Sequence, residues 1–225
     1  MPAVLFILSS ASKNLMGGRA GWYLPEAAHP YWILAPHATI DFASPAGPNP
    51  PLDPRSVEPY KDDKESVSFL EDETVKQKLA NAKKLSEVNV KDYDAIFYVG
   101  GHGPVLDLAF DEENARLASE AWKEGRIVSA VCHGPAALVK TIDAHGKPIF
   151  AGRRFTAFSN VEEELFGTVK EVPFSVEDKT IELGGLFEKA AEPWASHVVV
   201  DGKFITGENP ASAAGVGQAI LKALQ

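Results

Sequence analysis

The sequence lacks the features that stabilise secreted proteins or anchor membrane proteins. Its 225 residues include one cysteine, so no disulfide can form within the chain and the core alone must hold the fold. The first apolar run, Val4–Leu8, has five residues before the polar Ser9 and Ser10, which is too short for a signal-peptide core or a membrane span. We therefore expect a cytoplasmic protein, and the sequence leaves a nuclear pool open.

Basic residues are also few. Lysine and arginine number 22 against 31 aspartates and glutamates, which gives a net charge of −9. A protein that binds nucleic acid or an anionic membrane needs a basic face, so we expect neither partner and favour a small molecule. No GxxxxGK[ST] motif is present, and no GxGxxG opens a helix after the first apolar run, so we expect no bound cofactor.

Short β-rich runs alternate with stretches of helical character. A buried strand is predicted for each of four runs: Val4–Leu8, Thr39–Ala43, Ala95–Val99 and Ile127–Val131. Strands that alternate with helices form βαβ units, which build a mostly parallel sheet with helices on both faces. The length suits one α/β domain spanning residues 1–225.

The connecting segments differ in how clearly they can be interpreted. Amphipathic helices are predicted over Asp72–Lys84 and Asp111–Glu124, and a closing helix over Ala211–Leu224. The segment Ser44–Tyr60 contains six prolines, which predicts an irregular loop that could form a wall or lid of a pocket. The segment Glu171–Glu192 is compatible with either an edge hairpin or a helix.

The most informative stretch is IVSAVCHGPAAL, in which a predicted strand ends at Cys132 and a helix-forming segment follows. This is the outline of a nucleophile elbow, which places one side chain above the carboxyl end of the sheet. A helix N-terminus there would favour the thiolate. The alternative is that Cys132 is a small buried hydrophobic residue without a catalytic role, as a lone cysteine usually is. The adjoining His133 favours chemistry, because an imidazole there could exchange a proton with the sulfur.

One further turn and one aromatic segment contain candidate active-site residues. The turn GGHGP follows the strand AIFYV, and backbone N–H groups at Gly101 and His102 could hold an oxyanion; a purely structural turn is the alternative. Glu26 lies in the aromatic segment GWYLPEAAHPYW, where burial would raise the pKa of its carboxyl toward acid–base use, although most glutamates are exposed. Glu26 and His29 form an E-x-x-H pair. This pair alone is weak evidence for a metal site, and we expect no bound metal.

Four segments in order resemble the ThiJ/PfpI superfamily and, within it, the fungal heat-shock branch called glyoxalase III: GWYLPEAAHP, AIFYVGGHG, AVCHGPAAL and DGKFITGENPASA. The resemblance implies a flavodoxin-like three-layer sandwich with an elbow cysteine, often as a homodimer. It implies that Cys132 is the nucleophile, His133 the catalytic histidine, and Glu26 the acid that contacts the thiol. Gly101 and His102 match the oxyanion turn.

The same resemblance aligns Glu163, in TAFSNVEEELFG, with the acid that orients the histidine, although Glu162 and Glu164 make a slip of one residue conceivable. The implied activity is a glyoxalase III, a hydro-lyase of the D-lactate dehydratase type. It would convert small aldehydes such as methylglyoxal or glyoxal to hydroxy acids without glutathione or metal. Members of the superfamily are also described as holding chaperones, oxidation sensors and protein deglycases, and the elbow alone does not separate these alternatives.

Overall fold

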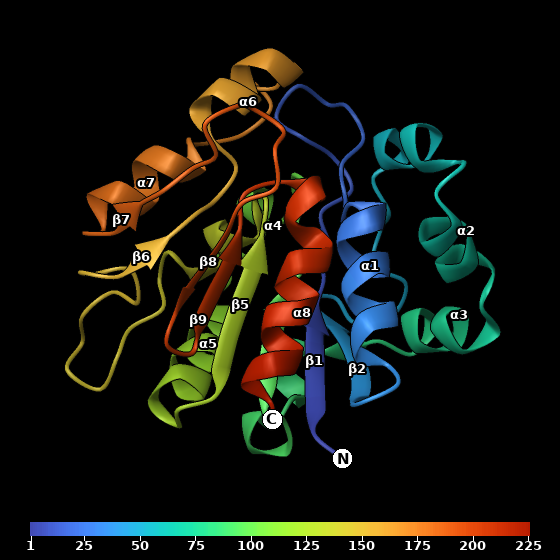
Figure 1. The fold of residues 1–225 in the computed structure, drawn as a ribbon, viewed down its shortest axis with the longest axis horizontal. Helices are drawn as coiled ribbons and strands as arrows, with labels where there is room; N and C mark the ends of the chain where they lie inside the picture. Colours follow the sequence, from blue (N-terminus) through green and yellow to red (C-terminus); the bar gives the residue numbers. More distant parts are fainter.

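The computed structural model describes residues 1–225 and contains a seven-stranded central sheet (Figure 1). Its strands are β1 (Ala3–Ile7), β2 (Thr39–Ser44), β3 (Lys83–Lys84), β4 (Ala95–Tyr98), β5 (Ile127–Val131), β8 (Val198–Asp201) and β9 (Phe204–Gly207). Their spatial order is β3-β2-β1-β4-β5-β9-β8. All neighbours pair in parallel except β8 and β9, which are antiparallel. The predicted mostly parallel sheet is confirmed.

Helices cover both faces of the sheet, so the molecule has three layers (Figure 1). One face packs against α1 (Leu24–Leu34) and α8 (Ala213–Ala223), with α2 (Lys64–Glu71) and α3 (Glu73–Ala80) beside α1. The other face packs against α4 (Gly103–Leu106), α5 (Glu112–Lys123) and a 3-10 helix over Gly134–Leu138.

Strand β1 shows why both faces must be covered. Val4 and Phe6 lie in the core on the α1 and α8 side, whereas Leu5 and Ile7 lie in the core on the α5 side. All four side chains are fully buried. Successive side chains of a strand point to opposite faces, so a continuous apolar run requires a helix layer on each side.

A smaller unit lies beside the β8 edge of the sheet and extends to α6 above the carboxyl ends of the strands (Figure 1). It comprises β6 (Arg154–Phe155), α6 (Asn160–Phe166), α7 (Val176–Glu182) and β7 (Leu186–Phe187), with β6 and β7 paired in parallel. Figure 1 shows this unit at the upper left, at the end of the sheet away from both chain termini. The segment Glu171–Glu192 is therefore a helix followed by a short strand, and the hairpin alternative is wrong.

Most element predictions agree with the structure, and the differences have local causes. The helix predicted to reach Lys84 ends at Ala80, because Lys83 and Lys84 pair with the edge of β2 instead. The proline-rich segment Ser44–Tyr60 is not irregular throughout, since 3-10 turns form over Pro54–Ser56 and Glu58–Tyr60. A proline in the first turn of a helix lacks only an N–H that would be unpaired there anyway. No helix combines the length and apolar composition that a membrane crossing requires.

Candidate active site

Cys132 follows β5 directly and occupies an unusual backbone conformation. Its φ is +61°, the left-handed region that costs a residue with a side chain about 1–3 kcal/mol. Two backbone hydrogen bonds hold it there: its N–H donates to the carbonyl of Gly207 at 2.9 Å, and its carbonyl accepts from the N–H of Phe158 at 2.8 Å. The thiol lines a cavity as a result.

The segment after Cys132 differs from the predicted elbow in one respect. The predicted helix does begin just after the thiol, but residues Gly134–Leu138 form a 3-10 helix rather than an α-helix. A single short 3-10 turn contributes little aligned dipole. The state of the thiol must therefore depend mainly on its neighbouring side chains.

The cavity above the thiol is small and mostly apolar, at about 30 Å³. It is lined by Tyr23, Glu26, Gly101, His102, Cys132, His133, Phe158, Phe166, Trp194 and Pro210. No residue of the proline-rich segment Ser44–Tyr60 is among them, so that segment is not a wall of this cavity. A larger surface hollow of about 540 Å³ over α5 is lined mainly by charged side chains and lies apart from Cys132.

Glu26 lies in the first turn of α1 with its carboxyl fully buried at the thiol. Neither carboxyl oxygen has a hydrogen-bond partner of good geometry. Burial raises the pKa of Glu26 well above its usual value, and the nearby thiol and the N–H groups of Gly100 and Gly101 offset this only in part. The structure thus places Glu26 in the apolar environment that the surrounding aromatic residues suggested.

The same burial acts on the cysteine. Desolvation raises the pKa of the Cys132 thiol, the charge of Glu26 raises it further, and the backbone N–H of Gly101 lowers it. Cys132 and Glu26 therefore compete for one negative charge and titrate as a coupled pair. A glycine is required at Gly100, since a Cβ there would lie 2.2 Å from Oε2 of Glu26.

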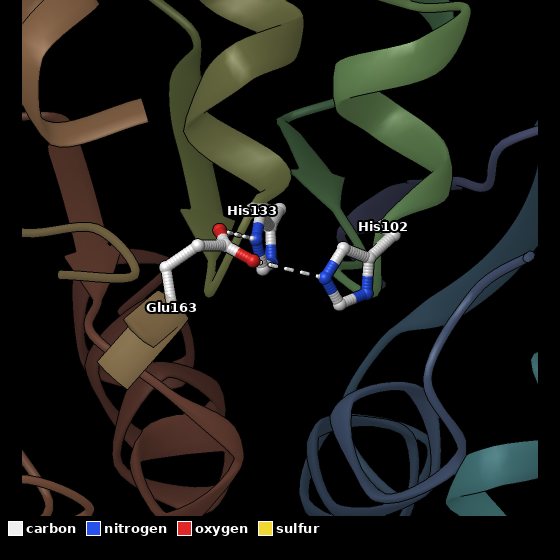
Figure 2. A group of neighbouring side chains, drawn as sticks. All are labelled: His102, His133 and Glu163. Carbon is white, nitrogen blue, oxygen red and sulfur yellow. Dashed lines mark hydrogen bonds and ion pairs between the residues drawn. The ribbon is translucent and has the colours of Figure 1, made fainter. Parts of the chain in front are cut away.

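A line of buried polar groups runs away from the sulfur. Sγ of Cys132 lies 3.3 Å from Nδ1 of His133. Nε2 of the same ring lies 2.6 Å from Oε2 of Glu163 (Figure 2). The pKa of Glu163 is lowered: burial opposes ionisation, but the two histidines beside it outweigh burial. An ionised carboxylate only accepts hydrogen bonds, so Nε2 of His133 carries a proton, and in the neutral ring Nδ1 presents a lone pair to the thiol.

Glu163 contacts a second histidine as well. Its Oε1 lies 3.2 Å from Nε2 of His102, which approaches from the turn after β4 (Figure 2). The hydroxyl of Thr168 donates to the same oxygen. The rings of His102 and His133 pack with centroids 4.3 Å apart. The side chain of His102 is thus held by Glu163 while the N–H of neighbouring Gly101 faces the thiol.

The three consecutive glutamates of α6 have distinct environments. Glu162 is fully buried and completes a capping box with Ser159. It also accepts hydrogen bonds from the backbone N–H of Trp194 at 2.9 Å and from the Asn209 amide at 2.8 Å. Glu164 is exposed. Only Glu163 of the three reaches His133, because successive helical residues point about 100° apart.

His102, His133 and Glu163 have the composition of a metal site, and their ligand atoms lie within 4.8 Å of one another. The guanidinium of Arg55 opposes a cation there, because Nη2 lies 3.3 Å from Nδ1 of His102. A metal on Nε2 would require the proton on Nδ1, directly against this donor. The E-x-x-H pair is divided, since Nε2 of His29 bonds to Asp63 at 2.9 Å rather than approaching Glu26.

Several residues of the site carried no signal in the sequence. Arg55 lies in the proline-rich segment and Thr168 beyond the end of α6, and neither belongs to a recognisable motif. Phe158, Phe166 and Trp194 cover the cavity, with Trp194 contacting both phenylalanine rings at centroid distances of 5.7 and 6.0 Å. They come from loops and a helix end whose place above the sheet is a tertiary property.

Comparison with known proteins identifies the family. The chain matches the DJ-1/PfpI family over residues 53–223. This protein belongs to the DJ-1/PfpI family. The chain is 29% identical to Glyoxalase 3 of Candida albicans, with 100% of this chain and 99% of that protein covered. It is 30% identical to the glutathione-independent glyoxalase HSP31 of Saccharomyces cerevisiae, with 88% and 86% covered.

Solved structures of DJ-1/PfpI relatives superpose closely on this protein. The Rapid Encystment Protein of Francisella tularensis is 35% identical with a TM-score of 0.94, and both chains are covered completely. Glyoxalase III of Candida albicans is 28% identical with a TM-score of 0.87, covering 99% of this chain and 97% of that one. The resemblance to the ThiJ/PfpI superfamily is confirmed, as is the three-layer α/β fold.

Proposed function

We propose that this protein is a glutathione-independent glyoxalase that converts methylglyoxal to lactate through Cys132. The observation that carries the proposal is the buried line from Sγ of Cys132 through His133 to Glu163, with the Glu26 carboxyl against the same sulfur. The names of the Candida and Saccharomyces relatives, aligned over most of this chain, support the same activity. The reaction is of the lactate dehydratase type, run toward hydration, and uses no glutathione, metal or organic cofactor.

The first step joins the sulfur to the aldehyde. The thiolate of Cys132 attacks the aldehyde carbon, and the buried acid of Glu26 protonates the aldehyde oxygen as the C–S bond forms, giving a hemithioacetal. Burial raises the pKa of Glu26, which keeps a proton available at neutral pH. The N–H of Gly101, which faces the sulfur, stabilises negative charge that develops on the oxygen.

The second step moves hydrogen between the two substrate carbons. The carboxylate left on Glu26 takes the proton from the former aldehyde carbon, and the hydroxyl proton on that carbon passes to the neighbouring carbonyl oxygen, giving an enediolate. Glu26 then returns its proton to the neighbouring carbon, and the C–O bond at the sulfur-bearing carbon becomes a carbonyl. The product is a lactate thioester of Cys132. One water then cleaves the thioester, and the lone pair on Nδ1 of His133 activates this water while Glu163 supports the imidazolium that forms. The net change is the addition of one water to methylglyoxal.

The decisive experiment measures lactate formed from methylglyoxal by purified protein without glutathione, in the presence of a chelator. Wild type should turn over, and Cys132→Ala should not. Ser9→Ala removes a hydroxyl that bonds to Asp107 outside the cavity, and it serves as the control for effects of mutagenesis and purification on activity. Absence of turnover in wild type would refute the glyoxalase proposal.

A holding-chaperone activity is a second candidate, favoured by exposed apolar side chains. Leu15, Met16 and Leu165 are each at least 60% exposed. Suppression of client aggregation that survives Cys132→Ala would support it, whereas loss in that variant would tie the effect to the thiol. Deglycase activity and oxidation sensing would both use Cys132 and are separated by the product that forms. The homodimer and the cytoplasmic location stay predictions, the first open to light scattering.

A further inference from the structure

Arg55 is held rigidly beside the candidate active site. Its guanidinium bonds to the buried carboxylate of Asp53 at 2.9 Å and to Oε2 of Glu171 at 2.8 Å. The same group lies over the ring of Phe166, 5.8 Å from its centroid. A planar guanidinium fixed by two carboxylates has little freedom to turn away. Its remaining contact is with Nδ1 of His102 at 3.3 Å.

This contact determines the protonation of His102. A guanidinium only donates hydrogen bonds, so Nδ1 of His102 must accept, and the ring proton must lie on Nε2. Nε2 then donates to Oε1 of Glu163 at 3.2 Å. Burial lowers the pKa of His102, the neighbouring His133 and Arg55 lower it further, and Glu163 opposes this only in part, so the ring stays neutral. Arg55 thereby selects one tautomer of one charge state.

We propose that Arg55 and His102 are positioning residues that hold Glu163 so that His133 presents its unprotonated Nδ1 to Cys132. The inference rests on the proposed role of Cys132 as nucleophile. Three donors meet the carboxylate of Glu163: Nε2 of His102, the hydroxyl of Thr168 and Nε2 of His133. With these donors in place the carboxylate keeps one rotamer and stays ionised.

Loss of the Arg55 donor breaks this arrangement at a defined point. Nδ1 of His102 could then take up a proton, because no donor would oppose it, while Nε2 would still donate to Oε1 of Glu163. The imidazolium that forms would draw the carboxylate toward His102, and the hydrogen bond of the carboxylate to His133 would weaken. The tautomer of His133 would no longer be fixed, and the reactivity of the thiol would fall.

We call the hydrogen-bonded series Arg55–His102–Glu163–His133 the relay. The charged and titratable groups that face it come from several elements. Cys132 faces Glu26 from α1 and His133 from its own turn. His102 faces Arg55, Glu163 and His133. Arg55 faces Asp53 and Glu171. The pH dependence of thiol reactivity therefore contains the coupled Cys132–Glu26 titration. A variant of Arg55 or His102 should displace this profile, because it changes the base at His133.

The first test measures ring protonation in the wild-type protein and uses one variant only to assign signals. Nitrogen-15 NMR of the imidazole rings reports which nitrogen of each histidine carries the proton, and His102→Gln identifies the His102 signals. His102 should be neutral at pH 7 with the proton on Nε2, and Nε2 of His133 should carry a proton. A proton on Nδ1 of His102, or a doubly protonated ring, would overturn the proposal.

The second test measures the rate at which iodoacetamide alkylates Cys132 as a function of pH. Arg55→Met should lower the rate at neutral pH about tenfold and displace the profile, as expected when a hydrogen bond to a charged group is lost. His102→Gln can still accept from Arg55 and donate to Glu163, so it should retain most of the rate, whereas His102→Phe should not. Arg116→Met removes an exposed arginine on α5 that pairs with Glu113 and should match wild type.

The outcomes separate this proposal from the glyoxalase proposal. Equal losses in His102→Gln and His102→Phe would mean that His102 only fills space, and a wild-type profile in Arg55→Met would remove Arg55 from the relay. Alkylation requires no aldehyde. A dependence of alkylation on Arg55 in a protein that forms no lactate would therefore support the relay and refute only the glyoxalase proposal.

Discussion

Oε2 of Glu163 lies 2.6 Å from Nε2 of His133, although the two residues are 30 positions apart and come from α6 and from the turn after β5. The bond holds a buried histidine against the thiol from the side opposite the sheet. Its strength comes from the ionised carboxylate, whose pKa the two neighbouring histidines lower against the effect of burial. The environments of the adjacent glutamates show that this contact is specific to one position.

Glutamine substitutions along α6 should therefore give three different results. Glu163→Gln should lower kcat by about 10²–10⁴-fold, since an amide can donate to His133 and favour the wrong tautomer. Glu164→Gln changes an exposed side chain and should leave kcat unchanged. Glu162→Gln should reduce the free energy of unfolding by about 1–3 kcal/mol, because it disturbs a fully buried network. Lactate assays with urea titrations distinguish these outcomes, and full activity of Glu163→Gln would contradict the assignment.

Glu26→Gln should separate activity from stability. The buried Glu26 carboxyl has no partner of good geometry, and its folded pKa is raised above the unfolded value. The folded state therefore binds the proton more tightly, and the wild type loses stability as pH rises above the unfolded pKa. Glutamine does not ionise, so the Tm of the variant should exceed that of wild type by a margin that grows with pH, while kcat falls by about 10²–10⁴-fold. Scanning calorimetry at pH 5 and pH 8 measures the margin.

Glu208, which does not line the cavity, gives a second prediction for the pH dependence of stability. Burial raises the pKa of Glu208 to about 7, and the neighbouring Glu162 carboxyl raises it too. Stability should fall as pH rises from the unfolded pKa to about 7. Glu208→Gln should then be more stable than wild type above pH 7, by up to about 3 kcal/mol, and equal to it below the unfolded pKa. Urea unfolding at pH 4 and pH 8 checks the sign, and a pH-independent difference would contradict it.

Trp194 should limit the size of the aldehyde that reacts. It covers a cavity of about 30 Å³, which holds only a few waters. Its φ is +67°, so glycine rather than alanine is the substitution that leaves the backbone unstrained. Trp194→Gly should raise kcat/KM for phenylglyoxal relative to methylglyoxal by roughly tenfold. Trp32→Phe, at a tryptophan whose indole bonds to the carbonyl of Glu65, should not change this ratio.

Periodicity accounts for the agreement between sequence and fold. The run AVLFI is apolar at every position, and IVSAV is apolar except for Ser129; both are buried on both faces, as central strands of a covered sheet are. The segment Glu171–Glu192 was ambiguous because its polar and apolar residues fit both periods. Contact with the 3-10 helix after Cys132 and pairing with β6 decide its structure. Residues Lys83–Lys84 continue the preceding helix in pattern, but sheet pairing with β2 overrides that preference.

The sequence by itself determined the parallel sheet and the turn that carries Cys132 and His133, because apolar period and turn composition are local properties. The resemblance to the ThiJ/PfpI superfamily added Glu26 and Glu163 as candidates. Only the tertiary structure decided that Glu163 rather than Glu162 reaches His133, that Glu26 is buried without a partner, and that Arg55 bonds to His102. These facts depend on which side chains the packing of distant segments brings within 3–4 Å, and pKa values follow from that packing. The charge state of the thiol is therefore a property of the assembled fold.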